Sequence, residues 1–248
     1  MVHEILDAPP VWFIIPAAGS GQRFAAGAPK QFLIVAGKSV LQHTVESILA
    51  HPQCAGVVVV LAQVHRQHAA LNCASAKPIL SADGGQTRAQ SVLSGLQALP
   101  AHLPENTLVA VHDAARPCVS TSDLTDLFAK AAAHPVGAIW AQAVTDTIKR
   151  AHPNGEIAGT LDRSELWRAQ TPQIFRLAPL KSALMQALAD SQAVSDEAQA
   201  MERLGFYAEL VQCPVENIKL THLRDLPSLE RFFHQKSSNE AIAMKDQL

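Results

Sequence analysis

Short apolar runs alternate with helical patterns along most of the chain. Five runs rich in apolar and β-branched residues predict strands buried on both faces, over 11–17, 56–62, 77–81, 107–112 and 136–141. Between them, apolar side chains recur at the spacing of amphipathic helices: Val40, Leu41, Val45, Ile48 and Leu49; Val92, Leu93, Leu96 and Leu99; Leu124, Leu127, Phe128 and Ala131. This alternation predicts an α/β fold, Rossmann-like and doubly wound around a mainly parallel sheet.

The regular alternation breaks over about 142–175. Strand-like pairs there surround the turn sequence PNG and do not lead into another crossover helix, so we predict a projecting β-arm. Helices are expected to resume over 178–190 and then from Ser195, as N-cap, to Gly205, as C-terminal stop. The polar tail from about 235 is expected to fray. We therefore predict a single domain, 1–248, that carries one arm.

Composition and charge exclude several classes of protein. The chain has 248 residues, 48% of them hydrophobic, which is enough for one sizeable core. Its 20 basic and 22 acidic residues give a formal charge of −2, so we expect neither nucleic acid nor a membrane as partner. The N-terminus lacks a basic region and its apolar run is short, which predicts a cytoplasmic protein. The four cysteines, Cys54, Cys73, Cys118 and Cys213, are too dispersed for a disulfide framework or a zinc site.

A glycine-containing loop follows the first predicted strand and reads PAAGSGQRFAAGAPKQF. Open α/β sheets bind ligands at this edge, and glycines let backbone N–H groups approach a phosphate closely. Arg23 and Lys30 would supply the positive charge that a triphosphate requires. The alternative is a tight turn with two solvated cations. Phe24 stands where the Rossmann pattern needs its third glycine, and Phe32 where a P-loop needs its first, so both of those loops are excluded.

Three further motifs indicate a binding site when they are considered together. In VHDAARP, Asp113 follows a strand and could hold a divalent metal or a substrate hydroxyl beside a phosphate bound by Arg116, although an Asp–Arg turn pair is the alternative. The turn DGGQTRAQSV could read a nucleobase edge with backbone amides and the Ser91 hydroxyl, or could be a plain loop. Lys219, in NIKLT, is expected in a short strand. His112 could be a packed strand residue or a catalytic one.

The order of these motifs resembles the 2-C-methyl-D-erythritol 4-phosphate cytidylyltransferase family of the non-mevalonate isoprenoid pathway. The resemblance rests on PAAGSGQRF…PKQF, DGGQTRAQSV, VHDAARP, DTIKR, LWRAQTPQIF, SDEA and NIKLT, which extend from Phe13 to about Phe233. It implies transfer of a cytidylyl group from CTP to 2-C-methyl-D-erythritol 4-phosphate, with Mg²⁺ as cofactor. It also implies a homodimer formed through the β-arm.

The resemblance assigns roles to individual positions. Arg23, Lys30, Lys219 and Asp113 match catalytic positions, and Asp113 is also a possible metal ligand. The positions matching CTP contacts are Ala17, Ala18, Gly19, Gly21, Gly85, Gln86 and Ser91. Those matching substrate contacts, some supplied by the neighbouring subunit's arm, are Arg116, Thr147, Arg163, Thr171 and Ser195.

Two positions depart from the family pattern. Gln86 stands where an acidic residue is common, which puts a side-chain contact to cytosine in doubt, although a backbone amide would still serve. Ser195 replaces a common threonine and keeps its hydroxyl. Two other functions stay open at this point. One is a cytidylyltransferase for another polyol phosphate, such as ribitol 5-phosphate, and the other is a non-catalytic nucleotide-binding module.

Overall fold

The computed structural model describes residues 9–19, 29–68, 71–213 and 217–245. Its centre is a seven-stranded sheet with the order β11-β7-β10-β6-β1-β4-β5. The strands are β1 (Val11–Pro16), β4 (Cys54–Leu61), β5 (Ile79–Asp83), β6 (Leu108–Val111), β7 (Gly137–Ala143), β10 (Trp167–Arg176) and β11 (Glu209–Gln212). Only β10 runs antiparallel to its neighbours, β6 and β7. The predicted mainly parallel α/β fold is confirmed, and all five predicted strands are present.

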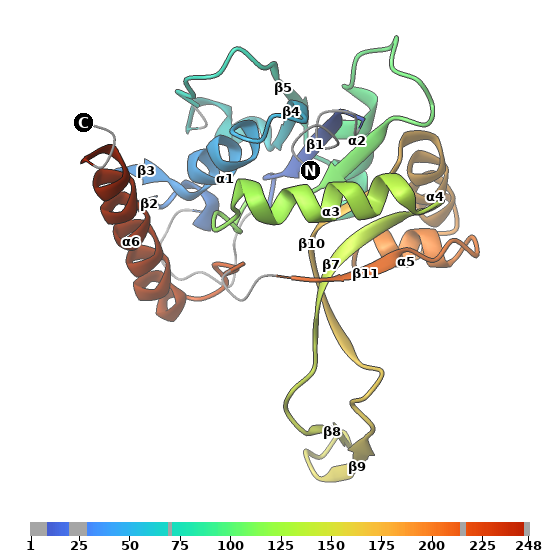
Figure 1. Cartoon of the computed structure of the whole chain (residues 1–248). Helices are drawn as coiled ribbons and strands as arrows, with labels where there is room; N and C mark the ends of the chain where they lie inside the picture. Colours follow the sequence, from blue (N-terminus) through green and yellow to red (C-terminus); the bar gives the residue numbers. More distant parts are fainter. Residues whose placement is uncertain (1–8, 20–28, 69–70, 214–216, 246–248) are drawn as a thin grey trace.

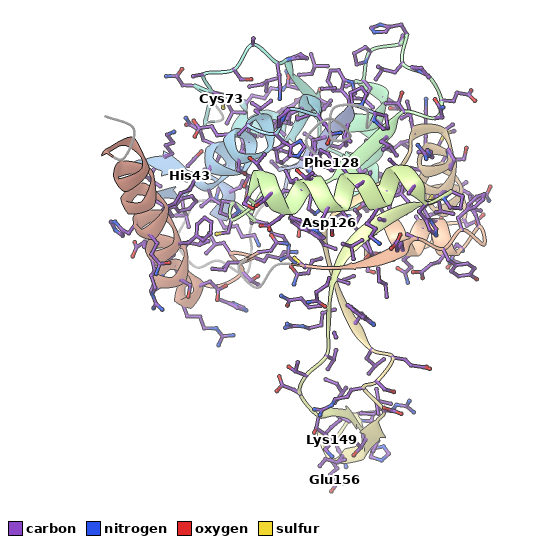
Figure 2. The ribbon with its side chains drawn as sticks, in the orientation of Figure 1. His43, Cys73, Asp126, Phe128, Lys149 and Glu156 are labelled. Carbon is purple, nitrogen blue, oxygen red and sulfur yellow. The ribbon has the colours of Figure 1, made fainter. Side chains whose placement is uncertain are left out.

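Helices cover both faces of this sheet (Figure 1). One face is covered by α1 (Val40–Leu49) and α3 (Thr121–Ala133), and the other by α2 (Arg88–Gln97), α4 (Leu177–Ala189) and α5 (Glu197–Glu202). A further helix, α6 (Leu226–Lys245), packs in a separate apolar cluster. Side chains of β1 alternate between two cores: Phe13 packs with α1 and α3, whereas Ile14 packs with α2, α4 and α5. On α3, Phe128 belongs to the first core and the exposed Asp126 lies on the opposite side of the helix (Figure 2).

The β-arm projects away from the sheet (Figure 1). Its tip is an antiparallel hairpin of β8 (Ile148–Ala151) and β9 (Ile157–Leu161), with Lys149 and Glu156 at the far end (Figure 2). The predicted boundary at 175 is wrong, because β10 returns from the arm into the sheet. There Gln173 to Phe175 pair with both β6 and β7. Ile174 and Phe175 are fully buried, so this end of the strand belongs to the core.

Several short elements lie between the larger strands and helices. They comprise the 3₁₀ helices η2 (Lys30–Phe32), η3 (Gln63–His68) and η4 (Leu223–Asp225), and a small hairpin of β2 (Ile34–Val35) and β3 (Lys38–Ser39). The tail predicted to fray from 235 is instead helical to Lys245, as part of α6. The first part of this helix is held by a third apolar cluster in which Leu229 and Phe233 pack with Val35. In the described part of the chain, no helix is both long and apolar enough to cross a bilayer.

Two local predictions require correction. Ser195 is not the N-cap of α5: Asp196 is, because its Oδ1 accepts the Gln199 N–H at 2.9 Å, while the Ser195 N–H bonds to the Gln199 side chain. The predicted stop at Gly205 is confirmed: the regular helix ends at Glu202, and Gly205, with φ of +78°, closes the following turn with its N–H bonded to the Glu202 carbonyl and the Phe206 N–H bonded to the Met201 carbonyl. Lys219 lies in extended chain that forms no ladder with any described strand. One backbone bond, from the Leu220 N–H to the Ala115 carbonyl, attaches this segment.

Gly137 opens β7 with φ of +143°, where an added Cβ would lie 2.0 Å from the Ile174 carbonyl oxygen. We predict that Gly137→Ala lowers the free energy of unfolding by about 3 kcal/mol, because it combines backbone strain with a steric overlap inside the sheet. Urea unfolding at neutral pH measures this. Gly159→Ala in the arm is the matched control, since its Cβ would meet no atom within 4 Å. Equal stability of the two variants would contradict the prediction.

Candidate active site

A cavity of about 740 Å³ opens beside the carboxyl ends of β1, β5 and β6. This edge is where open α/β sheets bind ligands. The cavity brings together predicted residues from four separate segments: Ala17, Ala18, Gly19, Lys30, Gly85, Gln86, Ser91, Asp113 and Lys219. Gly21 and Arg23 lie outside the described residues. The motifs that were far apart in the sequence therefore share one site.

Gln31 fixes the described part of the first loop. Its Nε2 donates to the carbonyl oxygens of Ala17 and Gly19, at 2.8 and 2.9 Å, and its side chain is buried. Both carbonyls are thereby turned toward Gln31. Sequence reasoning gave Gln31 no role, although it directly follows Lys30 in the quoted motif. The available signal was a polar side chain directly after Lys30, a residue predicted to bind phosphate.

The second loop forms a tight turn before α2. The Ser91 hydroxyl accepts the Gly85 N–H at 3.1 Å and donates to the Thr87 carbonyl at 3.0 Å. Thr87 caps α2 in a reciprocal arrangement with Gln90. Gly84 contacts the first loop so closely that an added Cβ would lie 2.2 Å from the Cβ of Ala18. The Ser91 hydroxyl thus shapes the turn, and Gly85 and Gln86 line the cavity.

Asp113 is the centre of charge in the cavity. Its Oδ2 lies 2.8 Å from Lys219 Nζ and 3.3 Å from Arg116 Nε, and its Oδ1 lies 3.6 Å from Arg88 Nη2. Burial opposes ionisation of this carboxyl, but Lys219, Arg88 and Arg116 outweigh it and hold its pKa well below the usual range. Asp113 is therefore ionised at neutral pH and fixes the position of the Lys219 ammonium.

A chain of hydrogen bonds holds the backbone of Asp113 from behind. The Asp113 N–H donates to Thr171 Oγ1 at 3.0 Å, and Thr171 Oγ1 lies 3.1 Å from His112 Nδ1. His112 Nε2 lies 2.9 Å from the Arg116 carbonyl oxygen, which can only accept. Nε2 must therefore carry the proton, and Nδ1 must accept from the Thr171 hydroxyl. His112 is a packed strand residue that supports the site and does not face the cavity.

The remaining predicted contacts lie outside the cavity lining. Arg116 and Thr171 are buried behind it, and Arg116 Nη1 donates to the Asn217 carbonyl at 2.8 Å. Thr147 and Arg163 are exposed on the arm, where Arg163 donates to the Thr145 carbonyl. Ser195 is exposed just before α5. Within one chain, the described arm residues do not complete the cavity.

Arg88 was missed as a site residue, although the sequence placed it on the helix after the second loop. It lines the cavity and donates two hydrogen bonds to Glu197, the second of them at 3.0 Å. Glu197 is buried. Among the described lining residues, Lys30, Arg88 and Lys219 are basic and Asp113 alone is acidic. The cavity is therefore suited to an anionic ligand.

The donor set fits a divalent cation bound jointly with a phosphorylated ligand. Among the described residues, no three His, Cys, Asp or Glu side chains gather as a metal cage. Mg²⁺ does not require such a cage, because it usually binds one or two carboxylates together with substrate phosphates and water. Asp113 could supply that carboxylate from the cavity wall.

Comparisons with known proteins agree with this geometry. Residues 11–235 match the family model described as IspD, 2-C-methyl-D-erythritol 4-phosphate cytidylyltransferase. The chain is 47% identical over 220 residues to the enzyme of that name from Xylella fastidiosa, covering 89% of this chain and 95% of the relative. The relative from Vibrio parahaemolyticus is 46% identical over 223 residues, with 90% and 95% covered.

Solved structures give the same result. The cytidylyltransferase of this name from Francisella tularensis superposes with a TM-score of 0.78 at 31% identity, covering 90% of this chain and 99% of that one. The Thermus thermophilus enzyme gives a TM-score of 0.71 at 31% identity, covering 90% and 98%. Both matches include almost the whole of the compared chain.

Burial lowers the pKa of His112 from 6.5 to about 4. Between these values the unfolded chain binds a proton that the folded chain does not. We therefore predict that the free energy of unfolding falls as the pH drops from 6.5 to 4, by roughly 3 kcal/mol for this group. Asp113 titrates below this window, because its pKa is well below its usual value.

Urea unfolding between pH 7 and pH 4.5 tests the prediction. His112→Asn, whose amide oxygen can replace the Nδ1 acceptor, should lose this part of the pH dependence. His43 and His51, whose pKa values burial also lowers, remain in both proteins, so the difference isolates His112. An identical pH dependence in the variant would show that His112 is not the titrating group.

Proposed function

This chain belongs to the 2-C-methyl-D-erythritol 4-phosphate cytidylyltransferase family, and from that membership we propose how its residues divide the work of the reaction. The enzyme transfers the cytidylyl group of CTP to 2-C-methyl-D-erythritol 4-phosphate. The products are 4-diphosphocytidyl-2-C-methyl-D-erythritol, an isoprenoid precursor, and pyrophosphate. The two relatives and two structures described above all carry the methylerythritol phosphate name, and this favours neither ribitol 5-phosphate nor a binding-only function.

The reaction requires positive charge more than acid–base chemistry. The attacking phosphate of the acceptor is already an anion, and the barrier lies in bringing it in line with the α-phosphorus of a second polyanion. The observation that carries the proposal is the cavity wall itself, whose described lining contains three cations, Lys30, Arg88 and Lys219, and one carboxylate, Asp113. Preorganised cations of this kind stabilise charge that develops in the transition state.

CTP is proposed to lie across the two loops. Backbone amides of the loop containing Ala17, Ala18, Gly19 and Gly21 would hold the triphosphate, with Arg23 and Lys30 as its countercharges. Gly85 and Gln86 would face the cytosine, and Ser91 would hold their turn in shape. Gln86 contributes through its backbone, which explains why an amide side chain can replace an acidic one.

The acceptor is proposed to bind beside Asp113 and Lys219. Their ion pair of 2.8 Å places one cation and one hydrogen-bond acceptor at the same point of the cavity. Arg116 and Thr171 contribute by positioning Asp113, because both are buried and bonded to it. Ser195 lies outside the cavity lining and would contact the acceptor only when the site closes. Mg²⁺, held by Asp113 and the CTP phosphates, would neutralise part of the triphosphate charge.

A homodimer would bring the missing arm residues to the site. The β8–β9 hairpin extends without a core of its own, and two-stranded ribbons are marginally stable alone. Ile157 and Trp167 expose apolar surface on this arm, at 67% and 39%. Each arm is therefore proposed to clasp the partner and deliver Arg163 and Thr147 into its cavity.

The cytoplasm is the proposed location. None of the four cysteines, all of them in the described part of the chain, forms a disulfide, and three of them are buried. Reduced thiols are the usual state in that compartment. The proposed partners are thus CTP, the methylerythritol phosphate and a second copy of this chain.

Lys30→Ala should reduce turnover by about a hundredfold, because it removes one preorganised contact to the transferring phosphate. The rate of pyrophosphate release from CTP in the presence of Mg²⁺ measures this. Methylerythritol phosphate is the acceptor, and ribitol 5-phosphate is the comparison. Lys38→Ala is the matched control, since Lys38 pairs with Glu46 on the exposed surface. Near wild-type turnover by Lys30→Ala would remove Lys30 from the phosphate site. Faster release with ribitol 5-phosphate would overturn the assigned acceptor.

Mixing Arg163→Ala with Lys30→Ala chains tests the shared site. A mixed dimer would hold one site with both lesions and one with neither, so random exchange should restore about a quarter of the wild-type specific activity. As a control, Lys149→Ala takes the place of Arg163→Ala. Lys149 donates to the Thr160 hydroxyl within the arm, so this variant should be active without mixing. No recovery after demonstrated subunit exchange would confine each arm to its own chain.

A further inference from the structure

The guanidinium group of Arg88 lies between two carboxylates. Arg88 is the first residue of α2 and binds both carboxylate oxygens of Glu197. The same Nη2 that donates to Glu197 Oε2 at 3.0 Å lies 3.6 Å from Asp113 Oδ1. The second distance is too long for a hydrogen bond. Arg88 is thus bonded to Glu197 and only adjacent to Asp113.

The two oxygens of Asp113 consequently differ. Oδ2 has cations at 2.8 and 3.3 Å, from Lys219 and Arg116. The shortest ion-pair distance to Oδ1 among the described residues is the 3.6 Å to Arg88. A freely moving arginine would close that gap, because a charge-assisted hydrogen bond to a carboxylate is among the stronger polar contacts in proteins. Something must hold Arg88 back.

Glu197 has the burial and the rigidity to do so. Its side chain is 1% exposed, and a buried charge is costly unless it is paired. The start of α5 is fixed from β10, since Gln173 accepts the Ala198 N–H at 2.9 Å and donates to Asp196 Oδ2 at 2.9 Å. Burial raises the pKa of Glu197, and its salt bridge with Arg88 opposes that rise. Arg88 is therefore the partner that the buried carboxylate needs.

We propose that Glu197 is a positioning residue that holds the Arg88 guanidinium away from Asp113 Oδ1, leaving this oxygen for the positively polarised groups of the substrates. Those groups are a hydroxyl of the acceptor or the metal ion that accompanies CTP. The inference rests on the proposed role of Asp113. It adds a second anion, Glu197, which is distant in sequence and whose charge determines whether Asp113 Oδ1 can bind a substrate group.

Glu197→Gln tests the inference by removing the charge with little change of shape. Arg88 should then move onto Asp113 Oδ1, and kcat/KM for the acceptor should fall about tenfold, while the affinity for CTP in calorimetric titration without Mg²⁺ stays within about twofold. Relief of the defect by raised Mg²⁺ would assign Oδ1 to the metal. An acceptor KM that stays high at every Mg²⁺ concentration would assign it to a hydroxyl.

The double variant R88M/E197Q distinguishes positioning from simple structural support. It removes the competing cation together with its partner, and an uncharged pair of similar size is often tolerated in place of a buried ion pair. We expect its activity to exceed that of E197Q. If the pair serves only to stabilise the fold, the double variant will be no more active than E197Q, and the inference is overturned.

Two further variants complete the test. Glu46→Gln disrupts the exposed Lys38–Glu46 pair and should leave the kinetics unchanged. Asp113→Asn tests the premise: if it is kinetically silent, the proposed role of Asp113 fails. If Asp113→Asn is impaired while E197Q behaves like E46Q, only the inference about Glu197 fails. Circular dichroism shows whether E197Q folds. If it does not, R88M/E197Q is compared with R88M and with wild type instead. Activity of the folded double variant above that of R88M would support the inference, and low activity equal to that of R88M would overturn it.

Discussion

The site depends on the attraction between the ionised carboxylate of Asp113 and the cations around it. The carboxylate pairs with Lys219 and Arg116 and lies beside Arg88, and these three cations come from segments that follow an edge strand, the middle strand and the other edge strand of the sheet. Without this anion, three neighbouring cations would repel one another in the free enzyme. With it, the cavity keeps an excess of positive charge for a triphosphate while the cations stay in place. One carboxylate therefore holds the basic side chains together and reduces the repulsion between them.

A buried polar layer behind Asp113 makes that arrangement rigid. Thr171 accepts the backbone N–H of Asp113 and is itself bonded to His112, and Arg116 binds the Asp113 side chain. Asn217, two residues before Lys219, extends the layer by donating to the Thr171 carbonyl at 2.9 Å. The segment that carries Lys219 is thus fixed by side-chain hydrogen bonds where a strand ladder is absent. This explains how a lysine on extended chain can hold a defined position.

The proposed dimer would make the site depend on the arm of a second chain. The hairpin of the arm leaves the sheet through β7 and returns through β10, whose last residues are part of the core. Movement of the arm base is therefore coupled to the strand that carries Thr171. Thr147 and Arg163 lie on the exposed part of the arm, so the cavity of one chain is lined by residues of the two glycine-containing loops and by Asp113, but not by these two predicted contacts.

The sequence by itself determined the elements whose signals are local. Five strands and the helices α1 to α4 follow from the spacing of apolar residues, and the glycine loops and basic residues placed Lys30, Gly85 and Asp113 at one edge of the sheet. The motif order determined the family. Even local signals were ambiguous where adjacent residues were equally suitable: Ser195 and Asp196 are both good N-caps, and only packing selects the second.

Tertiary structure alone decided which polar residues work together. Arg88 and Glu197 are 109 positions apart, and each reads in the sequence as an ordinary solvated charge on a helix. Gln31 and Asn217 likewise become structural because the chain buries them. The antiparallel return of β10 depends on pairing with two strands that precede the arm. Periodicity records only whether a side chain faces the core, whereas its partner is set by contacts that form when distant segments are folded together.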